Sequence, residues 1–468
     1  MENGYKRHVE EIASALRVDE SFDIVRRYLS VGEDEVCFFY VDGFTKDSEM
    51  QRLMQFMLTK TEIDGLESLI RTIPYIEVEG AQKASDIVRG VLSGQTAILS
   101  SAFPGSAVLV DARTYPARTT AEPDTDRVMQ GARDGFVETL VMNTALIRRR
   151  IRDPALTMRH FNLGGSSATD VVMCYMEGVA DKKLVESVAE KLSSIKPRGM
   201  CLGYQSLSES LIRRGWLNPF PKIRTTERPD AAAAQALEGS VLIICDTTPQ
   251  VMILPTSIFD YIQQTDDYYF PPLTGTYLRL VRTAILLLSV IITPLWYLCV
   301  EYSSTLPEPL LFLVPDDPGA LPIILQLLLV EAALDGLKIA SMNTPDMLSN
   351  SLSVVGALIL GDYAVGVGWL CEDVILYMAF VAIANFAQQN AELGYAFKYV
   401  RVIMLLLVYF LGVWGFGIGF LIFAVLLATN RTVSGARGYL YPLIPFAPKA
   451  LFHLLFRFKK RDFSSRDE

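Results

Sequence analysis

The stretch TAILLLSVIITPLWYLCV, residues 283–300, decides the class of fold, because it carries no charged side chain over a length close to that needed to cross a bilayer. Arginines lie just before it, and only acidic charges follow it before residue 321. These flanking charges are Arg279 and Arg282 before the stretch and Glu301, Glu308, Asp316 and Asp317 after it. Lys and Arg are enriched on the cytoplasmic side of membrane helices, so we expect residues 1–276 inside and the loop 301–320 outside.

Four more apolar segments follow, and together they predict an α-helical transmembrane bundle over residues 277–456. Their approximate bounds are 321–340, 351–370, 374–387 and 402–428. The last segment is too long for one upright helix and contains four glycines, Gly412, Gly415, Gly417 and Gly419. It predicts either a helical hairpin or a single strongly tilted helix. The basic C-terminal tail, 457–468, prefers the inside and favours the hairpin.

The first 276 residues have the composition of an ordinary soluble protein. They predict an α/β fold in two small mixed subdomains, 1–150 and 151–276. The pattern consists of short apolar strands bounded by turn residues, with amphipathic helices between them. The predicted strands are 34–41, 96–111, 171–176, 241–246 and 248–257, and the predicted helices are 48–72, 81–92 and 181–195.

Composition and short motifs argue against several classes of function. The net charge of −9 gives no support for nucleic-acid binding, which requires a basic face. The cysteines form no CxxC pair and the three histidines are scattered, so we expect no metal and no cofactor. No GxSxG or Walker A sequence occurs, and we do not expect an enzyme. The polar N-terminus is unlike a signal peptide, which predicts that the first half stays in the cytoplasm.

Three segments resemble a known family. They are EPDTDRVMQGARDGFVETLVMNTALIRRRIRDP at 122–154, NPFPKIRTTERPDAAAAQALEGSVLIICDTTPQVMILPTSIFDYIQQTDDYY at 218–269, and SVVGALILGDYAVGVG at 353–368. These segments resemble the A subunits of spore germinant receptors, and the resemblance covers nearly the whole chain. Within that family, the first segment and the strand DEVCFFYV at 34–41 resemble the stage V sporulation AF branch most closely.

The resemblance implies a multi-pass protein of the spore inner membrane with a role in germination. It also implies a ring-shaped homo-oligomer, a pentamer, around a central ion-conducting pore. The implied partners are further copies of the chain, other germination membrane proteins, monovalent cations and the lipid bilayer. Family A subunits usually act with a transporter-like B subunit and a lipoprotein C subunit, but the AF branch is not tied to one such receptor.

Two groups of charged residues in the first half favour a coupling or assembly surface. They are Arg148, Arg149 and Arg150, followed by Arg152, and then Arg224, Glu227 and Arg228. The alternative for the first group is a solvated helix face that pairs with acids such as Asp134 and Glu138. The prolines around the second group predict a rigid polar loop, whose charges pair across a subunit boundary. The alternative there is a plain connector between domains.

Glu331, Asp335 and Lys338 lie on one face of a predicted helix, at positions i, i+4 and i+7. Charged side chains at membrane depth are costly and usually face protein or water. These residues therefore line an ion path or form an intersubunit salt bridge. The alternative is an interfacial helix with a wet face that does not span the membrane.

The segment NSLSVVGALILG, 350–361, predicts the pore. Its small residues share one helical stripe, which either packs tightly against another helix or surrounds the axis of a ring. The predicted pore-lining residues are Ser353, Val354, Gly356, Ala357, Leu360 and Gly361. A ring of Leu360 or Val354 would close the pore by dewetting. Asp362, Glu372 and Asp373 would form an acidic vestibule that concentrates cations.

Three functions of different classes follow from these observations. The first is a homo-oligomeric channel, or channel-forming subunit, that releases monovalent cations during germination. The second is a non-conducting receptor or scaffold whose soluble half binds a ligand or partner. The third is an assembly factor of the sporulation membrane. Conductance separates the first function from the other two.

Overall fold

The computed structural model describes residues 2–113, 128–195, 203–212, 218–264, 266–343, 364–388, 390–430, 432–433 and 438–456. The chain divides into two compact units. The first, which we call the α/β unit, comprises Met1–Arg214, Ile223–Thr256 and Thr432–Gly438. The second, which we call the helical unit, comprises Gly215–Lys222, Ser257–Arg431 and Tyr439–Glu468.

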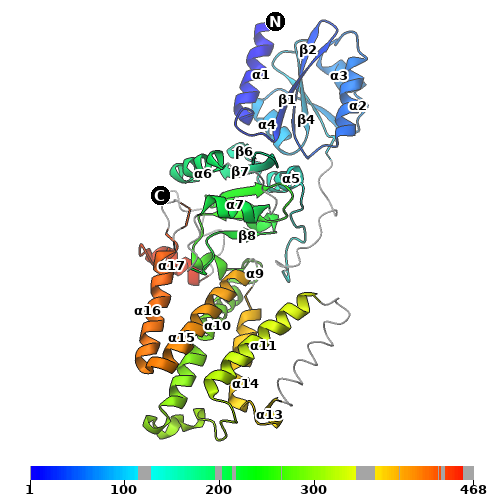
Figure 1. Ribbon diagram of the computed structural model, residues 1–468. Helices are drawn as coiled ribbons and strands as arrows, with labels where there is room; N and C mark the ends of the chain where they lie inside the picture. Colours follow the sequence, from blue (N-terminus) through cyan, green and yellow to red (C-terminus); the bar gives the residue numbers. More distant parts are fainter. Residues whose placement is uncertain are drawn as a thin grey trace. The chain divides into compact units, whose positions relative to one another are not determined.

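The first sheet of the α/β unit is antiparallel, with the strand order β1-β2-β4-β5-β3. Its strands are β1 (Ile24–Val31), β2 (Asp34–Val41), β3 (Val78–Ala81), β4 (Thr96–Ser100) and β5 (Ala107–Val110). The helices around it are α1 (Glu2–Leu16), α2 (Asp47–Leu58), α3 (Leu66–Thr72) and α4 (Ala84–Leu92). Figure 1 shows helices on both faces of this sheet.

Side-chain alternation explains why both faces are covered. Along β2, Cys37 and Phe39 pack with α1 and α4, whereas Val36 and Phe38 pack with α2 and α3. Successive residues of a strand point to opposite faces, and a strand that is apolar at every position needs a cover on each side. The run VCFF therefore dictates a three-layer arrangement.

The second sheet repeats this architecture with the strand order β6-β7-β9-β10-β8. Its strands are β6 (Leu156–Leu163), β7 (Thr169–Met176), β8 (Arg224–Thr226), β9 (Val241–Cys245) and β10 (Val251–Leu254). The helices are α5 (Leu140–Arg150) and α8 (Pro229–Leu237) on one face, and α6 (Lys182–Ser194) and α7 (Tyr204–Leu211) on the other. Element by element, α5 to β10 follow the same succession as α1 to β5, so the unit is a tandem structural repeat.

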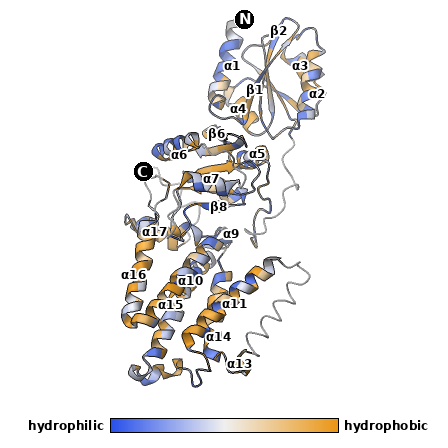
Figure 2. Cartoon of the chain, viewed as in Figure 1, coloured by the Kyte–Doolittle hydropathy of each residue, from blue (hydrophilic) through white to orange (hydrophobic). Residues whose placement is uncertain are grey.

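The helical unit contains the apolar segments. Its elements are η1 (Ile258–Tyr261), α9 (Asp266–Tyr269), α10 (Pro272–Glu301), η2 (Ser303–Thr305), η3 (Glu308–Leu313), α11 (Ile323–Asn343), α13 (Ala364–Gly366), α14 (Glu372–Phe386), α15 (Ala391–Leu411), α16 (Val413–Thr429) and α17 (Pro448–Leu455). Among the described residues, α10 and α15 are long and apolar enough to cross a membrane, and α16 is apolar but shorter. Figure 2 shows the hydrophobic colouring of these helices.

The last apolar segment is a helical hairpin, as the basic tail favoured. The chain turns at Gly412, whose φ of 57° is strained for other residues. A side chain there would also collide with the hydroxyl of Tyr302. Gly415 lies against the backbone of Leu407 and Gly419 against Met404, so the glycines let α15 and α16 approach closely. The first arm begins at Ala391, well before the apolar run, because polar residues extend the helix.

Other predicted bounds need correction. Segment 96–111 is the hairpin β4–β5, and segment 48–72 is the two helices α2 and α3. The pattern missed β1 and β6, because both are edge strands whose outward positions are polar and break the apolar run. It also missed β8, which lies within the predicted rigid loop and pairs with β10.

Candidate functional site

A row of charged and aromatic side chains joins α11 to α15 within the helical unit. As the spacing predicts, α11 presents Glu331, Asp335 and Lys338 on one face. From α15, three residues at intervals of one turn meet them in antiparallel order. These are Arg401 opposite Glu331, Lys398 opposite Asp335, and Tyr395 opposite Lys338. We call these six residues the charged zipper.

The inner end of the zipper is a buried ion pair. Nη2 of Arg401 donates to Oε1 of Glu331 at 2.6 Å, and the Arg401 side chain is 0 % exposed. Nη1 of the same guanidinium donates to the carbonyl of Ser289 on α10 at 3.1 Å. Pro294, further along α10, leaves the carbonyl of Val290, the residue after Ser289, without its helical N–H donor. Arg401 therefore connects three helices.

The outer end of the zipper is more accessible. The ammonium of Lys398 pairs with Asp335 and lies 3.5 Å from Oε1 of Glu331. Nζ of Lys338 lies 4.7 Å from the centre of the Tyr395 ring, within cation–π range. The exposed fraction of the acidic side chains rises from 8 % at Glu331 to 37 % at Asp335. The row thus leads from solvent-accessible surface to a desolvated pair.

The contacts of the zipper bear on the roles predicted for the charged residues of α11. Glu331 and Asp335 find their counter-charges within the same chain, so no intersubunit salt bridge is required to neutralise them. Glu331 is buried, whereas Asp335 is partly exposed, and α11 is not among the described helices that are apolar enough to cross a membrane. The interfacial alternative therefore stays a prediction. The sequence pattern does not single out Lys398 and Arg401, because the uncharged apolar run starts after them, at 402. One sequence feature does indicate them: KYVR at 398–401 places two cations three residues apart, immediately before an apolar run.

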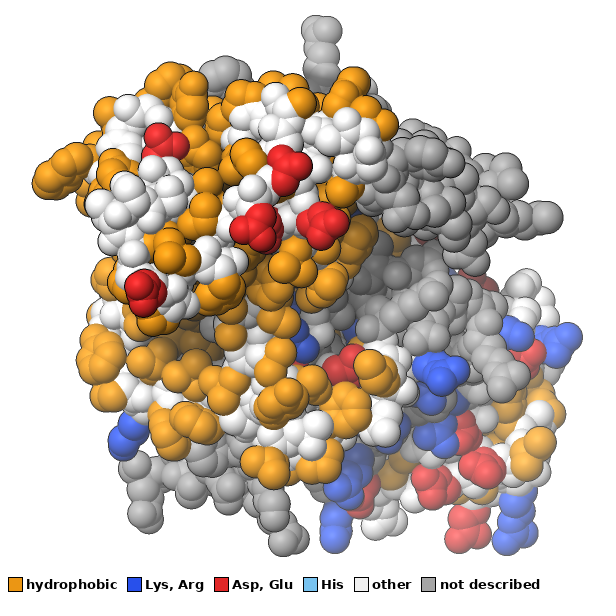
Figure 3. All heavy atoms as spheres, turned by 90° about the horizontal axis from the view of Figure 1, so that it is seen from below, with side chains coloured by type: hydrophobic (Ala, Val, Ile, Leu, Met, Phe, Trp, Pro, Cys, Tyr) orange, Lys and Arg blue, Asp and Glu red, His pale blue; other side chains and the backbone are white. Residues whose placement is uncertain are grey.

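One end of the helical unit is purely acidic. Its charged residues are Glu301, Glu308, Asp316, Asp317, Glu372 and Asp373, and no Lys or Arg occurs in 296–322 or 364–376. Glu372 and Asp373 occupy the first turn of α14, where the helix dipole favours anionic groups. Figure 3 shows acidic side chains scattered among apolar groups on this end. The predicted pore-lining residues Ser353, Val354, Gly356, Ala357, Leu360 and Gly361, and also Asp362, lie outside the described residues.

The three consecutive arginines of α5 have different environments. Arg148 is 0 % exposed and makes a two-pronged contact with Asp23, through Nε at 2.7 Å and Nη2 at 3.0 Å. Its guanidinium also donates to the Ser21 hydroxyl and the Leu156 carbonyl. Arg150 pairs with Asp134, as the solvated-face alternative predicted, and Arg149 is exposed. Arg148 therefore joins the two repeats, whereas an assembly role for the group stays a prediction.

The second charged group is also engaged within the chain. The Arg228 side chain is buried, and its Nη2 donates to Asp230 at 2.7 Å and to the Ala132 carbonyl at 3.0 Å. Glu227 accepts from the amide of Gln250 at 3.0 Å. Arg224 lies in β8, where its backbone N–H donates to the Thr256 hydroxyl. These contacts anchor the edge of the second sheet, and pairing across a subunit boundary stays a prediction.

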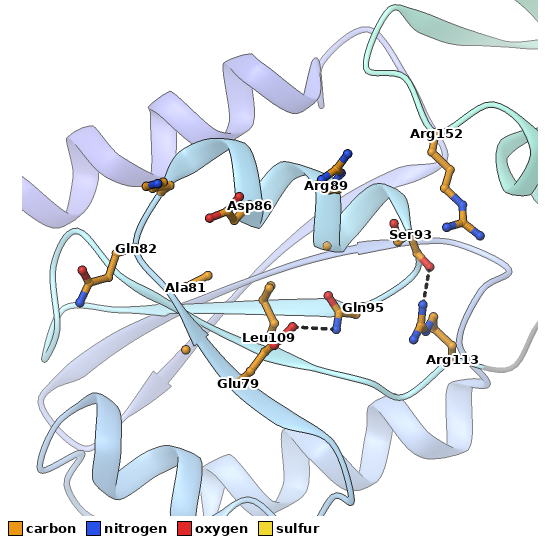
Figure 4. A pocket seen from close by; sticks show the side chains of 13 residues that line it. Glu79, Ala81, Gln82, Asp86, Arg89, Ser93, Gln95, Leu109, Arg113 and Arg152 are labelled. Carbon is orange, nitrogen blue, oxygen red and sulfur yellow. Dashed lines mark hydrogen bonds between the residues drawn. The ribbon is translucent and has the colours of Figure 1, made fainter.

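A polar pocket of about 680 Å³ lies beside α4 and the edge strand β3 (Figure 4). Four cationic side chains line it, together with two acidic ones. They are Lys83, Arg89, Arg113 and Arg152, with Glu79 and Asp86. Asp111 outside the lining holds Arg113 through a 2.7 Å hydrogen bond, which lowers the pKa of the Asp111 carboxyl. The pocket is large enough for a small polar ligand.

A repeated α/β unit followed by apolar helices that enclose an ion-pair zipper defines a two-part protein associated with membranes. The chain belongs to the family of Bacillus/Clostridium GerA spore germination proteins, whose model matches residues 10–468. It is therefore a member of a germination and sporulation membrane protein family.

Individual relatives agree with this assignment. The stage V sporulation protein AF of Bacillus subtilis (strain 168) is 35% identical over 459 residues, which cover 97% of this chain and 92% of that protein. Spore germination protein KA of the same organism is 27% identical and covers 94% of this chain and 82% of its own length. The N-terminal domain of the A subunit of the Bacillus megaterium germinant receptor GerK3 aligns with 52% of this chain and 92% of its own, at 24% identity and a TM-score of 0.39. The predicted family and branch are confirmed by the first two matches.

Proposed function

We propose that the chain is a subunit of a homo-oligomeric ring, a pentamer, in the spore inner membrane, and that this ring releases monovalent cations during germination. The observation that carries the proposal is the acidic end of the helical unit, where six carboxylates occur with no basic residue in 296–322 or 364–376. A ring of subunits multiplies this charge around one axis. Clustered negative charge raises the local concentration of cations and steers them to a pore mouth.

The charged zipper supplies the rigid element that such a pore needs. Its ion pairs tie α11 to α15, and Arg401 extends the tie to α10. The pore segment 350–361 follows α11 in the sequence. Since the charges of Glu331 and Asp335 are balanced by Lys398 and Arg401, the zipper acts as a fixed support, and the cations pass elsewhere.

Ion flux from liposomes that contain the purified protein tests the proposal. In the ring, Leu360 closes the pore by dewetting, so Leu360→Ala or Val354→Ser should raise the unstimulated efflux of potassium and sodium. Leu358→Ala is the matched control for Leu360→Ala, because helical spacing places residue 358 about 160° from residue 360, and it should leave the efflux at the level of the parent protein. Spores that carry Leu360→Ala should germinate early.

Oligomer integrity decides how a negative result is interpreted. If Leu360→Ala and Val354→Ser leave an intact oligomer and the efflux stays at the control level, the pore belongs to another segment or does not exist. If all substitutions on the stripe only weaken the oligomer, the stripe is a packing face.

The polar pocket favours a second candidate, a non-conducting receptor or scaffold. Its lining of Lys83, Arg89, Arg113 and Arg152 suits a small anionic ligand, and its volume of about 680 Å³ falls within the range of small-molecule sites. The same liposome experiment separates the two candidates, because a receptor without a pore gives no efflux with any variant.

A further inference from the structure

The segment 439–456 exposes several large apolar side chains, although it lies near a strongly basic sequence. Five of them are well exposed, and we call them the apolar cluster. They are Leu443 at 43%, Ile444 at 61%, Phe446 at 69%, Phe452 at 52% and Phe456 at 38% exposed. Single apolar residues on a surface need no explanation. Five within 14 residues form an exposed apolar patch, which is typical of an interaction site.

Two aromatic residues of the apolar cluster lie on one face of helix α17. Phe452 and Phe456 are one turn apart, and their ring centroids lie 4.7 Å from each other, so both rings share one face. Lys449 is exposed in the first turn, which starts with Pro448. Four of the five residues that follow Phe456 are basic, in the sequence RFKKR at 457–461. Aromatic and basic residues in one short segment are typical of a helix that lies in a membrane surface.

A hydrogen bond sets the level of α17 along the first apolar helix. Nη1 of Arg279 on α10 donates to the Leu454 carbonyl at 3.2 Å. Arg279 and its neighbour Arg282 also pair with the buried carboxylate of Asp267. Arg279 lies one turn before residue 283, where the uncharged run of α10 begins. Helix α17 is therefore held where α10 changes from polar to apolar, which is the level of the lipid headgroups in a spanning helix.

We propose that residues 439–456 form an in-plane anchor in the cytoplasmic leaflet, with the apolar cluster among the acyl chains, and that the charge of the RFKKR sequence that follows adds attraction to anionic lipids. The inference rests on the proposed placement of the apolar helices, α10 and α16 among them, in the bilayer. Apolar side chains favour immersion to the headgroup boundary, and each nearby Lys or Arg adds attraction to an anionic surface. A second copy of the chain is a poor occupant, because equivalent RFKKR sequences would repel one another.

Photo-crosslinking of the full-length protein in vesicles tests this proposal. The vesicles contain phosphatidylcholine with or without phosphatidylglycerol, and p-benzoylphenylalanine replaces Phe446 or Phe452. Leu421 on α16 is the positive control, because it is 62% exposed on an apolar helix, and Leu58 on α2 is the negative control, at 56% exposed. We expect lipid adducts by mass spectrometry at 446, 452 and 421 and none at 58. We also expect a yield at 452 that is several-fold higher with phosphatidylglycerol.

The controls separate failure of the anchor from failure of the membrane placement. Lipid adducts at 421 with none at 446 and 452, or with crosslinks to protein there instead, overturn the anchor and leave the spanning helices standing. Absence of lipid adducts at 421 overturns the membrane placement on which the anchor rests. An adduct yield at 452 that stays the same when Lys459 and Lys460 are changed to Gln, in vesicles with phosphatidylglycerol, overturns the electrostatic part.

Discussion

The charged side chain of Arg148 is fully buried. Its guanidinium donates to the carboxylate of Asp23, the hydroxyl of Ser21 and the carbonyls of Asp153 and Leu156. A buried ion pair is stable only when its remaining hydrogen-bonding groups are also satisfied. Because Asp23 precedes β1 and Leu156 begins β6, this one side chain ties the first repeat to the second.

Removal of Arg148 should therefore destabilise the α/β unit. Arg148→Met leaves Asp23 buried and without its counter-charge, which costs about 3–5 kcal/mol. The midpoint of thermal unfolding of the full-length protein in detergent, followed by circular dichroism, measures the loss. The double variant Arg148→Met with Asp23→Leu should recover part of it, because neither charge remains buried.

Arg149→Met provides the control one residue away. Arg149 is exposed, so any contact that it makes is screened by solvent, and its substitution should change stability by about 1 kcal/mol or less. Equal losses for the Arg148 and Arg149 variants would show that the Asp23 pair contributes nothing to the fold.

At the scale of elements, two kinds of contact hold α11: the zipper joins it to α15, and buried apolar residues such as Leu327 and Val330 pack it against α14. Several apolar residues of α11 are exposed in the helical unit, among them Leu325, Leu329 and Ile339. A neighbouring face contacts α15 through Glu331, Asp335 and Lys338. Removal of one zipper partner weakens this hold, because the charge left behind is desolvated.

Glu331→Leu should destabilise the helical unit by several kcal/mol, since it strands the buried guanidinium of Arg401. Lys338→Met is the matched control on the same face, and it should cost about 1 kcal/mol, the value of an accessible cation–π contact. Thermal unfolding in detergent and the oligomer fraction by size-exclusion chromatography are the measurements. Unchanged values for Glu331→Leu would mean that α11 is held by its apolar contacts alone.

At the scale of the whole molecule, the distribution of charge predicts the orientation in the membrane. Basic residues mark the start of α10 and the C-terminal tail, and acidic residues mark the other end of the helical unit. The positive-inside rule therefore predicts that the α/β unit and the tail lie in the cytoplasm and that 301–320 lies outside. The proposed in-plane anchor belongs to the same cytoplasmic side.

Cysteine labelling of intact cells with a membrane-impermeant maleimide tests this orientation. Leu310→Cys should be labelled and Lys60→Cys should be protected, and the reverse pattern would invert the topology. The labelling uses a background in which Cys201, Cys299 and Cys371 are changed to Ala. The other three native cysteines interfere little, because burial raises the pKa of the Cys37 and Cys174 thiols to about 12 and that of Cys245 to about 11. These thiols stay protonated and unreactive at neutral pH.

The local sequence pattern alone predicted several secondary-structure elements and the family of this protein. The uncharged run at 283–300 predicts α10, the strand at 34–41 coincides with β2, and the charges at 331, 335 and 338 share one helix face as their spacing requires. Long ordered motifs also identified the family. These features depend on the period of apolar residues over a few turns, which any one segment carries by itself.

Only the tertiary structure determined which charged side chains pair with each other. Arg148 and Asp23 are 125 residues apart, and Arg401 and Glu331 are 70 apart, so no local period relates them. The tandem repeat likewise appears only in the order of strands within each sheet. The reason is that a buried charge selects its counter-charge by where folding brings the two together in a region without water, and that position results from packing over the whole chain.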